Sequence, residues 1–387
     1  MSDRLILKNF GCKVNQTEGE ELYKALLSGG KIPEGETVYL VNGCAVTARA
    51  EEKARQYLRR VSVKGRVLLT GCLARKEEYL SRYETVFHDG PYVPSGKRNR
   101  TRVFVKVQDG CDSFCSYCVV PLLRGAPRSR PIAEILRELE DVSDAPEAVI
   151  CGINLAAYSS RGKDFIDLVE EISKTFSFRI RLSSLEPDRL DEEKLNRLFA
   201  IKSLAPHFHL PLQSGSGRIL RLMKRKYDLS FYMGLVKKIR KWDPLAGVTT
   251  DIIAGFPDES DEDFLETVRA VRQAEFSRAH LFTYSSRPGT AASLMAQLPE
   301  PVKKERKKEL ERWTSLAERD FLNKNIGAVL SVAAERNTDG IWEGMSGNYV
   351  RVFFPGSARR PRLEKVVITE VIPPRGLRAE FLKERQK

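Results

Sequence analysis

Three short apolar runs within the first 72 residues each end in the pair Gly-Cys, and this repeat constrains the fold more than any other feature. The runs are RLILKNFGC, ETVYLVNGC and GRVLLTGC, which end at Cys12, Cys44 and Cys72. The helical patterns EGEELYKALLSGG and TARAEEKARQYLRRV separate them. Strands that alternate with helices predict a parallel α/β sheet. Because the carboxyl ends of parallel strands share one edge, we expect the three cysteines to gather there.

The same alternation continues from about residue 101. The expected strands are VFVKVQ, EAVICGIN, FRIRLSSLE, HFHLPLQ, GVTTDIIAGF and SRAHLFTYS. Helical patterns such as PIAEILRELEDV, SGRILRLMKRK and DEDFLETVRAVRQA lie between them. This order predicts a full or partial (β/α) barrel, which carries its active site at the carboxyl ends of the strands.

The last part of the chain changes character. Residues 302–325 form a charged helical pattern, interpreted as a connecting helix, with Leu310, Trp313 and Leu316 on one side. After Gly327 short strands and turns predict a small all-β module. Residues 327–387 hold eleven Lys and Arg against seven Asp and Glu, and a small basic barrel suits an oligonucleotide. We therefore expect three domains: 1–98, an N-terminal parallel α/β sandwich; 99–325, the barrel; and 326–387, the β-module.

Composition narrows the class of protein. The chain has 65 Lys and Arg against 52 Asp and Glu, a net charge of +13 that favours a polyanionic partner such as nucleic acid. Its seven cysteines are an odd number in a long chain, which argues against a disulfide framework. No apolar stretch is long enough to span a bilayer, and the N-terminus lacks a secretory signal. We expect a cytoplasmic protein without a membrane partner.

The tightest cysteine cluster is Cys111-Asp-Ser-Phe-Cys115-Ser-Tyr-Cys118, which follows the first expected barrel strand. Three thiolates on one loop can hold a metal centre. Structural zinc wants four ligands, but no fourth Cys or His is near. The four histidines, His88, His207, His209 and His280, look scattered. Three cysteines around a cubane cluster would leave one iron open to bind a small molecule. A non-catalytic zinc- and RNA-binding protein remains the remote alternative.

The strings around these cysteines resemble a known enzyme family. CxxxCxxC after the first strand of such a barrel is similar to the radical S-adenosylmethionine enzymes. The whole chain resembles the radical methylthiotransferases, through GCKVNQTEGE, VNGCAVTARAEEKARQ, LLTGCLAR, VQDGCDSFCSYCVVPLLRGAPRSR, HFHLPLQSGSGRILRLMKRKY, TDIIAGFPDESDEDF and FTYSSRPGTAA. The C-terminal module resembles that family's TRAM domain, an RNA-binding β-barrel.

This resemblance implies cofactors, partners and ligands. Cys111, Cys115 and Cys118 would bind a radical-generating [4Fe-4S] cluster. A second [4Fe-4S] cluster, which carries the sulfur, would be bound by Cys12, Cys44 and Cys72. S-adenosyl-L-methionine would serve both as methyl donor and as radical source. The implied partners are tRNA, an electron donor such as flavodoxin or ferredoxin, and a sulfur donor.

Several other residues are candidates for S-adenosylmethionine contact. Tyr117 takes a position that often flanks the adenine in the superfamily, and the others follow barrel strands or lie in LPLQSGS. They are Tyr117, Gly152, Asn154, Ser184, Glu186, Gln213 and Ser214. Ser and Glu at strand ends are also often only caps. The basic run Arg124, Arg128 and Arg130 is either a solvated surface or a phosphate contact, and Cys151 is expected in the core.

The family divides by substrate, and the resemblance selects one branch. GCKVNQ and CAVTARAEEKARQ look most like the branch that modifies N6-threonylcarbamoyladenosine at C2, beside the anticodon of tRNA. The alternatives are isopentenyladenosine in tRNA and an aspartate of a ribosomal protein. Only 38 residues separate Cys72 from Cys111, fewer than usual for the family, so we expect the end of the N-terminal domain to be trimmed.

Overall fold

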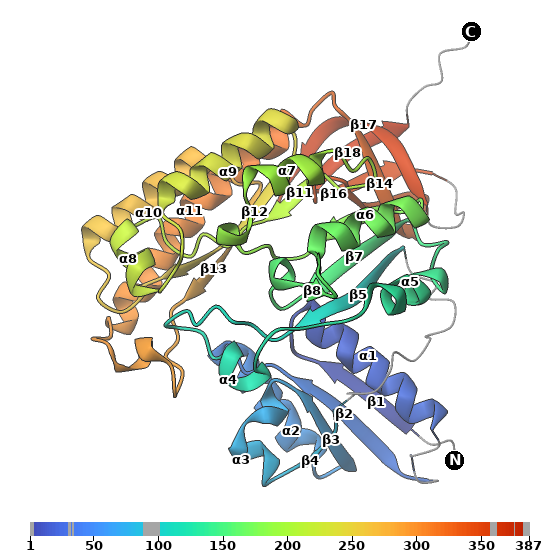
Figure 1. The fold of residues 1–387 in the computed structure, drawn as a ribbon, viewed down its shortest axis with the longest axis vertical. Helices are drawn as coiled ribbons and strands as arrows, with labels where there is room; N and C mark the ends of the chain where they lie inside the picture. The colour runs from blue at the N-terminus through green and yellow to red at the C-terminus, as the bar shows by residue number, and fades with distance from the viewer. Residues whose placement is uncertain are drawn as a thin grey trace.

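Three units follow one another along the chain. The computed structural model describes residues 4–29, 32, 35–87, 101–356, 362–374 and 376–381. They form a parallel sheet with helices, an open (β/α) barrel and a closed small β-barrel, which confirms the expected α/β class. Figure 1 shows the first unit below the central one and the closed barrel at its upper right. The expected domain boundary at residue 98 lies outside the described residues.

The N-terminal unit is a four-stranded parallel sheet in the order β1-β2-β3-β4. Its elements are β1 (Arg4–Asn9), α1 (Lys13–Ser28), β2 (Thr37–Gly43), α2 (Ala48–Val61), β3 (Arg66–Gly71), η1 (Leu73–Arg75), α3 (Glu77–Leu80) and β4 (Glu84–Thr85). Leu40 of β2 packs with Leu22 of α1, whereas the next residue, Val41, packs with Leu58 of α2. Helices on both faces explain why β2 is an unbroken apolar run.

The central unit is a partial barrel made of two sheets. One has the order β10-β7-β5-β6 and the other β11-β12-β13. The strands are β5 (Arg102–Asp109), β6 (Arg128–Ser129), β7 (Glu147–Gly152), β10 (Arg179–Leu182), β11 (His207–His209), β12 (Gly247–Ala254) and β13 (Arg278–Thr283). Isolated parallel bridges join Ile180 to Leu204 and Ser184 to His209, so β11 continues the curve of β10.

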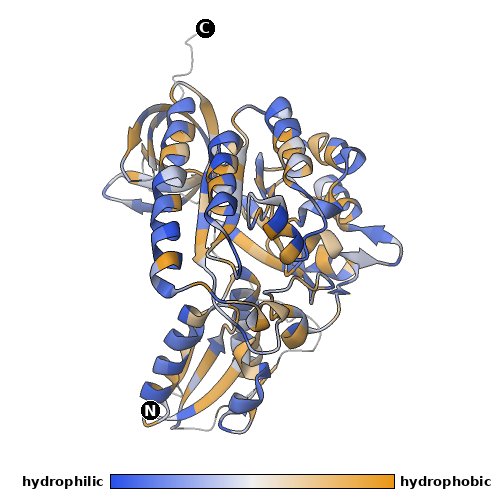
Figure 2. Ribbon diagram, turned by 90° about the vertical axis from the view of Figure 1, so that its left-hand side faces the viewer, coloured by the Kyte–Doolittle hydropathy of each residue, from blue (hydrophilic) through white to orange (hydrophobic). Residues whose placement is uncertain are grey.

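Helices cover the outside of this barrel. They are α5 (Ile132–Glu140), α6 (Phe165–Thr175), α7 (Glu192–Phe199), α8 (Gly217–Leu222), α9 (Leu229–Trp242), α10 (Asp261–Ala274) and α11 (Glu300–Lys324). The short helix α4 (Val120–Arg124) lies instead against the N-terminal unit, where Leu123 packs on the core of that unit. Short elements complete the unit: η2 (Leu155–Ala157), β8 (Ser159–Ser160), β9 (Lys163–Asp164), η3 (Pro187–Arg189) and η4 (Ala291–Leu294). Figure 2 shows apolar strands behind helices whose outer faces are hydrophilic. The expected connecting helix, α11, also packs on α10 and β13, so it belongs to the barrel's outer layer.

The C-terminal unit is the expected all-β module. It is a closed barrel in the order β14-β15-β16-β18-β17. The strands are β14 (Val329–Thr338), β15 (Ile341–Ser346), β16 (Arg351–Pro355), β17 (Leu363–Ile372) and β18 (Gly376–Phe381). Its core is built from side chains that alternate along these strands, including Val332, Phe354 and Ile368.

A buried ion cluster fastens the closed barrel to the central unit. Glu147, at the start of β7, accepts hydrogen bonds from Arg179 and Arg181 on β10. Arg179 also donates to the backbone carbonyl of Ser331 at 2.7 Å, and Arg181 donates to that of Gly347 at 2.9 Å. The closed barrel therefore sits at the amino ends of the barrel strands, opposite the end where the loop of Cys111, Cys115 and Cys118 follows β5.

Candidate active site

The three Gly-Cys runs bring their cysteines to one edge of the N-terminal sheet. The last residues of β2 and β3 are paired, so Cys44 and Cys72 leave the sheet side by side. Cys12 is exposed just before α1, whereas the other two are buried. Burial is the main cause that raises the pKa of Cys72 to about 11; Arg124 opposes the rise, and the charges of Cys12 and Cys44 add to it. The three thiols are therefore within electrostatic reach of one another.

The second group of cysteines lies on the loop after β5. Cys115 Sγ accepts a hydrogen bond from Arg225 at 3.3 Å, and Cys111 Sγ accepts one from the side-chain Nδ2 of Asn154 at 3.8 Å. Burial raises the pKa of Cys118 to about 12, and the charges of Cys115 and Cys111 push it the same way. Thiolates that repel one another in a buried place are stabilised when a metal supplies positive charge.

Arg124 connects the two cysteine groups. It ends α4, shortly after Cys118, and is 2% exposed. Its guanidinium donates to Cys72 Sγ at 3.1 Å, to Asp109 at 2.7 Å and to Glu18 at 2.9 Å. The interpretation of Arg124 as a solvated surface residue or a phosphate contact is wrong, because these buried partners use its charge.

The loop of Cys111, Cys115 and Cys118 fits an iron–sulfur cluster better than a single zinc ion. Among the described residues, no three Cys, His, Asp or Glu side chains surround one ion-sized position. Structural zinc needs four ligands around one ion, whereas a cubane cluster holds its cysteines on separate irons. Asn154 Oδ1 is buried beside this loop with no hydrogen-bond partner within the described ranges. One polar atom is therefore free to meet a ligand.

A cavity of about 180 Å³ lies between the two units that carry the cysteines. The central barrel contributes Tyr117, Cys118 and Gln213, and the segment after the second Gly-Cys run contributes Val46 and Thr47. Gln213 has a left-handed backbone, with φ of 67°, a strained conformation of the kind that clusters at ligand sites. Burial raises the pKa of the Tyr117 phenol well above its ordinary value.

Two further candidates reach the cysteines rather than the cavity wall. Asn154 contacts Cys111, as described above. Glu186 forms an ion pair with Arg225, the residue that donates to Cys115. Burial raises the pKa of Glu186, although Arg225 pulls it down. Both residues are therefore placed to hold the cysteine loop.

The remaining candidates are not among the residues that line this cavity. Gly152 ends β7, and a Cβ there would lie 3.0 Å from Gln108 Oε1, so the position needs a small residue. Ser184 is half-buried, and its backbone bridges toward β11. The Ser214 hydroxyl is fully buried, 3.2 Å from that of Thr267. Each of these three residues has a structural role at the end of a strand. Contact with S-adenosylmethionine stays a prediction for all three.

Three histidines that look scattered in the sequence meet inside the barrel. His207 and His209 both lie 2.9 Å from the hydroxyl of Thr249, and His209 is 3.3 Å from Asp251. The ring of His280 lies 6.0 Å from that of His209. The three histidines are therefore neighbours in the fold, although no group of three Cys, His, Asp or Glu side chains among the described residues could hold a metal ion. The sequence string HFH already indicated that His207 and His209 lie together, because alternate residues of a strand share one face.

Known proteins match the chain along most of its length. Residues 105–271 match the radical SAM superfamily, and residues 4–89 match a family described as Uncharacterized protein family UPF0004. A threonylcarbamoyladenosine tRNA methylthiotransferase MtaB of Chlamydia pneumoniae is 34% identical, and the alignment covers 89% of this chain and 90% of the relative. The chain belongs to the radical S-adenosylmethionine methylthiotransferase family.

Other relatives of this methylthiotransferase bear two different names. A threonylcarbamoyladenosine tRNA methylthiotransferase MtaB of Thermotoga maritima is 34% identical, with 91% of each chain covered. A tRNA-2-methylthio-N(6)-dimethylallyladenosine synthase of Bacillus mycoides is 32% identical, with 95% of this chain and 84% of the relative covered. Membership in the radical SAM superfamily implies S-adenosylmethionine and one [4Fe-4S] cluster.

A solved structure shows the same fold. The radical S-adenosylmethionine methyltransferase TsrM of Kitasatospora setae is similar with a TM-score of 0.53 and 14% identity, over 76% of this chain and 74% of that one. At this identity the likeness concerns the fold. In this methylthiotransferase, no helix among the described residues combines the length and apolar character needed to cross a bilayer.

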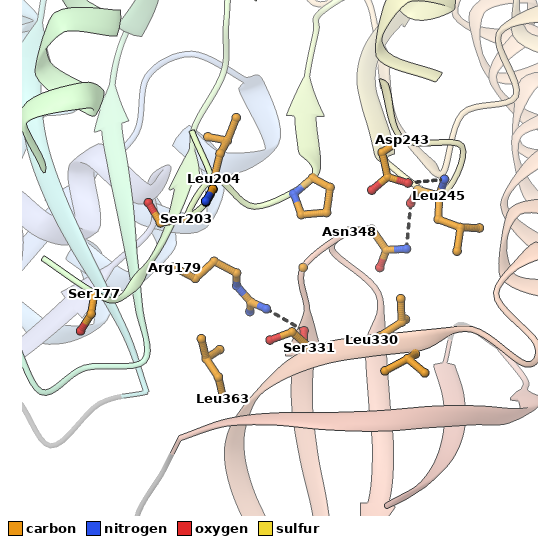
Figure 3. Close-up of a pocket in the computed structure, with 14 residues that line it drawn as sticks. Ser177, Arg179, Ser203, Leu204, Asp243, Leu245, Leu330, Ser331, Asn348 and Leu363 are labelled. Atoms are coloured by element: carbon orange, nitrogen blue, oxygen red, sulfur yellow. Dashed lines mark hydrogen bonds between the residues drawn. The ribbon is translucent and has the colours of Figure 1, made fainter. Parts of the chain in front are cut away.

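A second, larger cavity of about 500 Å³ lies far from the cysteines, between the central unit and the closed barrel. Figure 3 shows Arg179 and Asn348 pointing into it, with Arg179 bonded to Ser331. Asn348 donates to the carbonyl of Leu245 at 2.9 Å. These two polar side chains line the cavity and already form hydrogen bonds between the central unit and the closed barrel. This cavity is therefore an interface feature of the methylthiotransferase and not its reaction site.

Proposed function

We propose that this methylthiotransferase inserts a methylthio group at C2 of N6-threonylcarbamoyladenosine, next to the anticodon of tRNA. Relatives named for threonylcarbamoyladenosine are 34% identical over about nine tenths of the chain. The observation that carries the proposal is the shared cavity, which Cys118 and Tyr117 line from one side and Val46 and Thr47 from the other. Groups held by the two units can therefore act on one substrate atom.

The proposal assigns a [4Fe-4S] cluster to each cysteine group. Cys111, Cys115 and Cys118 would hold one, and Cys12, Cys44 and Cys72 the other. When bound together with S-adenosylmethionine, these groups supply hydrogen-atom abstraction and a methylated sulfur. Radical chemistry suits the substrate because an aromatic C–H offers no useful acid to a general base.

The chain's own residues position these groups. Arg225 and Asn154 donate to Cys115 and Cys111, which supports the loop on the barrel side. On the sheet side, Arg124 donates to Cys72. Hydrogen bonds to a ligating sulfur orient it and tune the potential of its metal centre.

We further propose a division of labour among three domains. Residues 1–98 hold the sulfur-carrying cluster, residues 99–325 generate the radical, and residues 326–387 bind tRNA. The net charge of +13 supports a polyanionic substrate. An electron donor such as a flavodoxin or ferredoxin and a sulfur donor complete the system in the cytoplasm.

The same chemistry on isopentenyladenosine is the second candidate. It is favoured by the relative from Bacillus mycoides, which is named for the dimethylallyl nucleoside and is 32% identical. The two candidates differ in the chemistry of the N6 substituent, which is polar and anionic in one and apolar in the other.

Nucleoside mass spectrometry tests the proposal directly. Bulk tRNA is analysed from cells that lack the gene and from cells that regain it. We expect methylthio-threonylcarbamoyladenosine to disappear and return. A change in methylthio-isopentenyladenosine would instead support the second candidate. If no tRNA nucleoside changes, both fail, and mass spectrometry of ribosomal proteins then tests for a modified aspartate.

A further inference from the structure

A set of polar side chains covers the inner face of the barrel next to the cavity. It consists of His209, Thr249, Asp251 and His280, and we call it the polar wall. Asp251 belongs both to this wall and to the cavity lining, so the two are continuous. His280 is exposed although it stands on the inner face of β13, beside Asp251 in the register of β12 and β13. The wall therefore faces open space.

Lys13 approaches the same wall from the N-terminal unit. Its ammonium lies 5.2 Å above the ring of Tyr349 and 3.4 Å from its hydroxyl, and 5.7 Å above the ring of Phe104. In the part of the chain that the structure describes, Lys13 contacts these aromatic groups and no carboxylate. It differs in this from the nearby Arg181, whose guanidinium is bound to Glu147.

Cationic side chains gather around Tyr349, next to the polar wall. Burial alone would raise the pKa of the Tyr349 phenol, but Lys13, with Arg102 and Arg181, lowers it below its ordinary value. Partial burial of its ring lowers the pKa of His280. Asp251 opposes this, whereas His209, Arg278 and Lys13 lower it further. An anionic ligand group near Lys13 would be stabilised by these charges.

An aromatic ring stands at the cavity end of the wall. Phe282 is 39% exposed and lines the cavity together with Cys118. It lies two residues beyond His280 on β13, hence on the same face and roughly 7 Å further along. Exposed aromatic rings of this kind are platforms on which unstacked bases are held.

On the basis of the proposed function, we propose that the polar wall binds the N6-threonylcarbamoyl substituent of the substrate adenosine, with the Lys13 ammonium pairing with its terminal carboxylate. The adenine lies against Phe282, beside the cysteines. Asp251 accepts a hydrogen bond from the N–H or hydroxyl groups of the substituent. Lys13 is then a specificity-determining residue, and the Tyr349 and Phe104 rings hold its side chain in place.

The chemistry of the wall discriminates between the two candidate substrates. A threonylcarbamoyl group offers a carboxylate, a hydroxyl and N–H groups to the charged and polar side chains. An isopentenyl group offers none, and it would cover the Lys13 ammonium without supplying a carboxylate to pair with its charge, which is costly. The wall therefore favours the anionic substrate.

The test compares two RNAs. Anticodon stem-loops carry either threonylcarbamoyladenosine or its neutral analogue, in which the carboxylate is a carboxamide. We expect the wild-type holoenzyme to prefer the carboxylate RNA by about 10- to 100-fold, the range of one charge-assisted hydrogen bond, in Kd by fluorescence anisotropy and in KM. Lys13→Met should remove this preference, and Lys13→Arg should keep most of it.

Three controls make the outcome decisive. Lys24→Met removes a charge from the other end of α1 and should leave the preference intact. Lys24→Met should also keep the iron content and the RNA-free cleavage of S-adenosylmethionine of the wild type, and both are measured in Lys13→Met to detect a lost cluster. If the wild-type enzyme binds both RNAs equally, or if the preference survives in Lys13→Met, the role of Lys13 is overturned. The proposed function is not affected by either result. If the wild type modifies only an isopentenyladenosine RNA, the proposed function fails as well.

Discussion

Arg124 Nε donates a hydrogen bond to Cys72 Sγ over 3.1 Å, although 52 positions separate the two residues. Arg124 belongs to the loop region that carries Cys118, and Cys72 belongs to the N-terminal sheet. The same guanidinium binds Glu18 of α1 and Asp109 at the end of β5. One buried side chain therefore fixes the position of one cysteine group relative to the other.

Replacing Arg124 should destabilise the contact between the two units. In Arg124→Met the carboxylates of Glu18 and Asp109 lose the Arg124 guanidinium and keep Lys106 as their other close cation. Losing hydrogen bonds between charged groups costs about 1.5–3 kcal/mol. We expect a decrease of this size in the free energy of unfolding, measured by urea denaturation of the apo protein. Arg128→Met is the matched control, since Arg128 is exposed and lies 3.6 Å from Asp109. It should cost less than about 1 kcal/mol. Equal decreases in both variants would contradict the role of Arg124.

The alternation of strands and helices along the chain followed from the sequence because each strand is a short apolar run. The Gly-Cys ends of three strands also predicted that Cys12, Cys44 and Cys72 share one edge, and their thiols lie within electrostatic reach of one another. Cys151 was expected in the core and is fully buried. Such inferences succeed because they depend on local periodicity and on parallel pairing.

Contacts between distant segments could not be predicted in this way. Arg124 has the sequence context of a surface run, and only the fold brings Glu18 and Cys72 to it. His209 and His280 lie on different strands, so no spacing rule connects them. The path of α1, which brings Lys13 into the central barrel, likewise depends on how two units pack.

Iron content tests the assignment of two clusters. After anaerobic reconstitution the wild type should hold about eight irons, the sum of two cubanes. Replacing Cys12, Cys44 and Cys72 together with Ala should leave about four, with S-adenosylmethionine still cleaved. Replacing Cys111, Cys115 and Cys118 should also leave about four, but should abolish cleavage. About four irons in the wild type, unchanged by the first triple substitution, would contradict the second cluster.

The ion cluster under the closed barrel predicts a pH-dependent stability. Burial acts to raise the pKa of Glu147, but Arg181 and Arg179 outweigh it and hold the pKa at about 2. Because the folded pKa lies below the ordinary value of 4.5, the pair stabilises the fold above about pH 4.5 and loses its effect as the pH falls toward 2. At about 1.4 kcal/mol per unit, it contributes about 3 kcal/mol near neutral pH.

Glu147→Gln checks this effect. Its deficit in unfolding free energy against the wild type should be full at pH 7 and should shrink as the pH is lowered below 4.5. The matched control is Glu171→Gln, which breaks the exposed pair with Lys174 and should show little deficit at any pH. A deficit that is independent of pH would show that the charge of Glu147 is not what stabilises the docking.

The closed barrel should bind tRNA through exposed basic side chains. Arg336 on β14 and Lys365 on β17 are both exposed. Replacing both with Ser should weaken tRNA binding and reduce the slope of log affinity against log salt by about 1 for each phosphate that is no longer neutralised. Cleavage of S-adenosylmethionine should not change, because the closed barrel lies at the opposite end of the central barrel from Cys111, Cys115 and Cys118. The control, Lys237→Ser with Lys241→Ser on α9, removes the same charge from the outside of the central barrel. An equal decrease in affinity in the two double variants would mean that net charge, rather than the closed barrel, attracts the RNA.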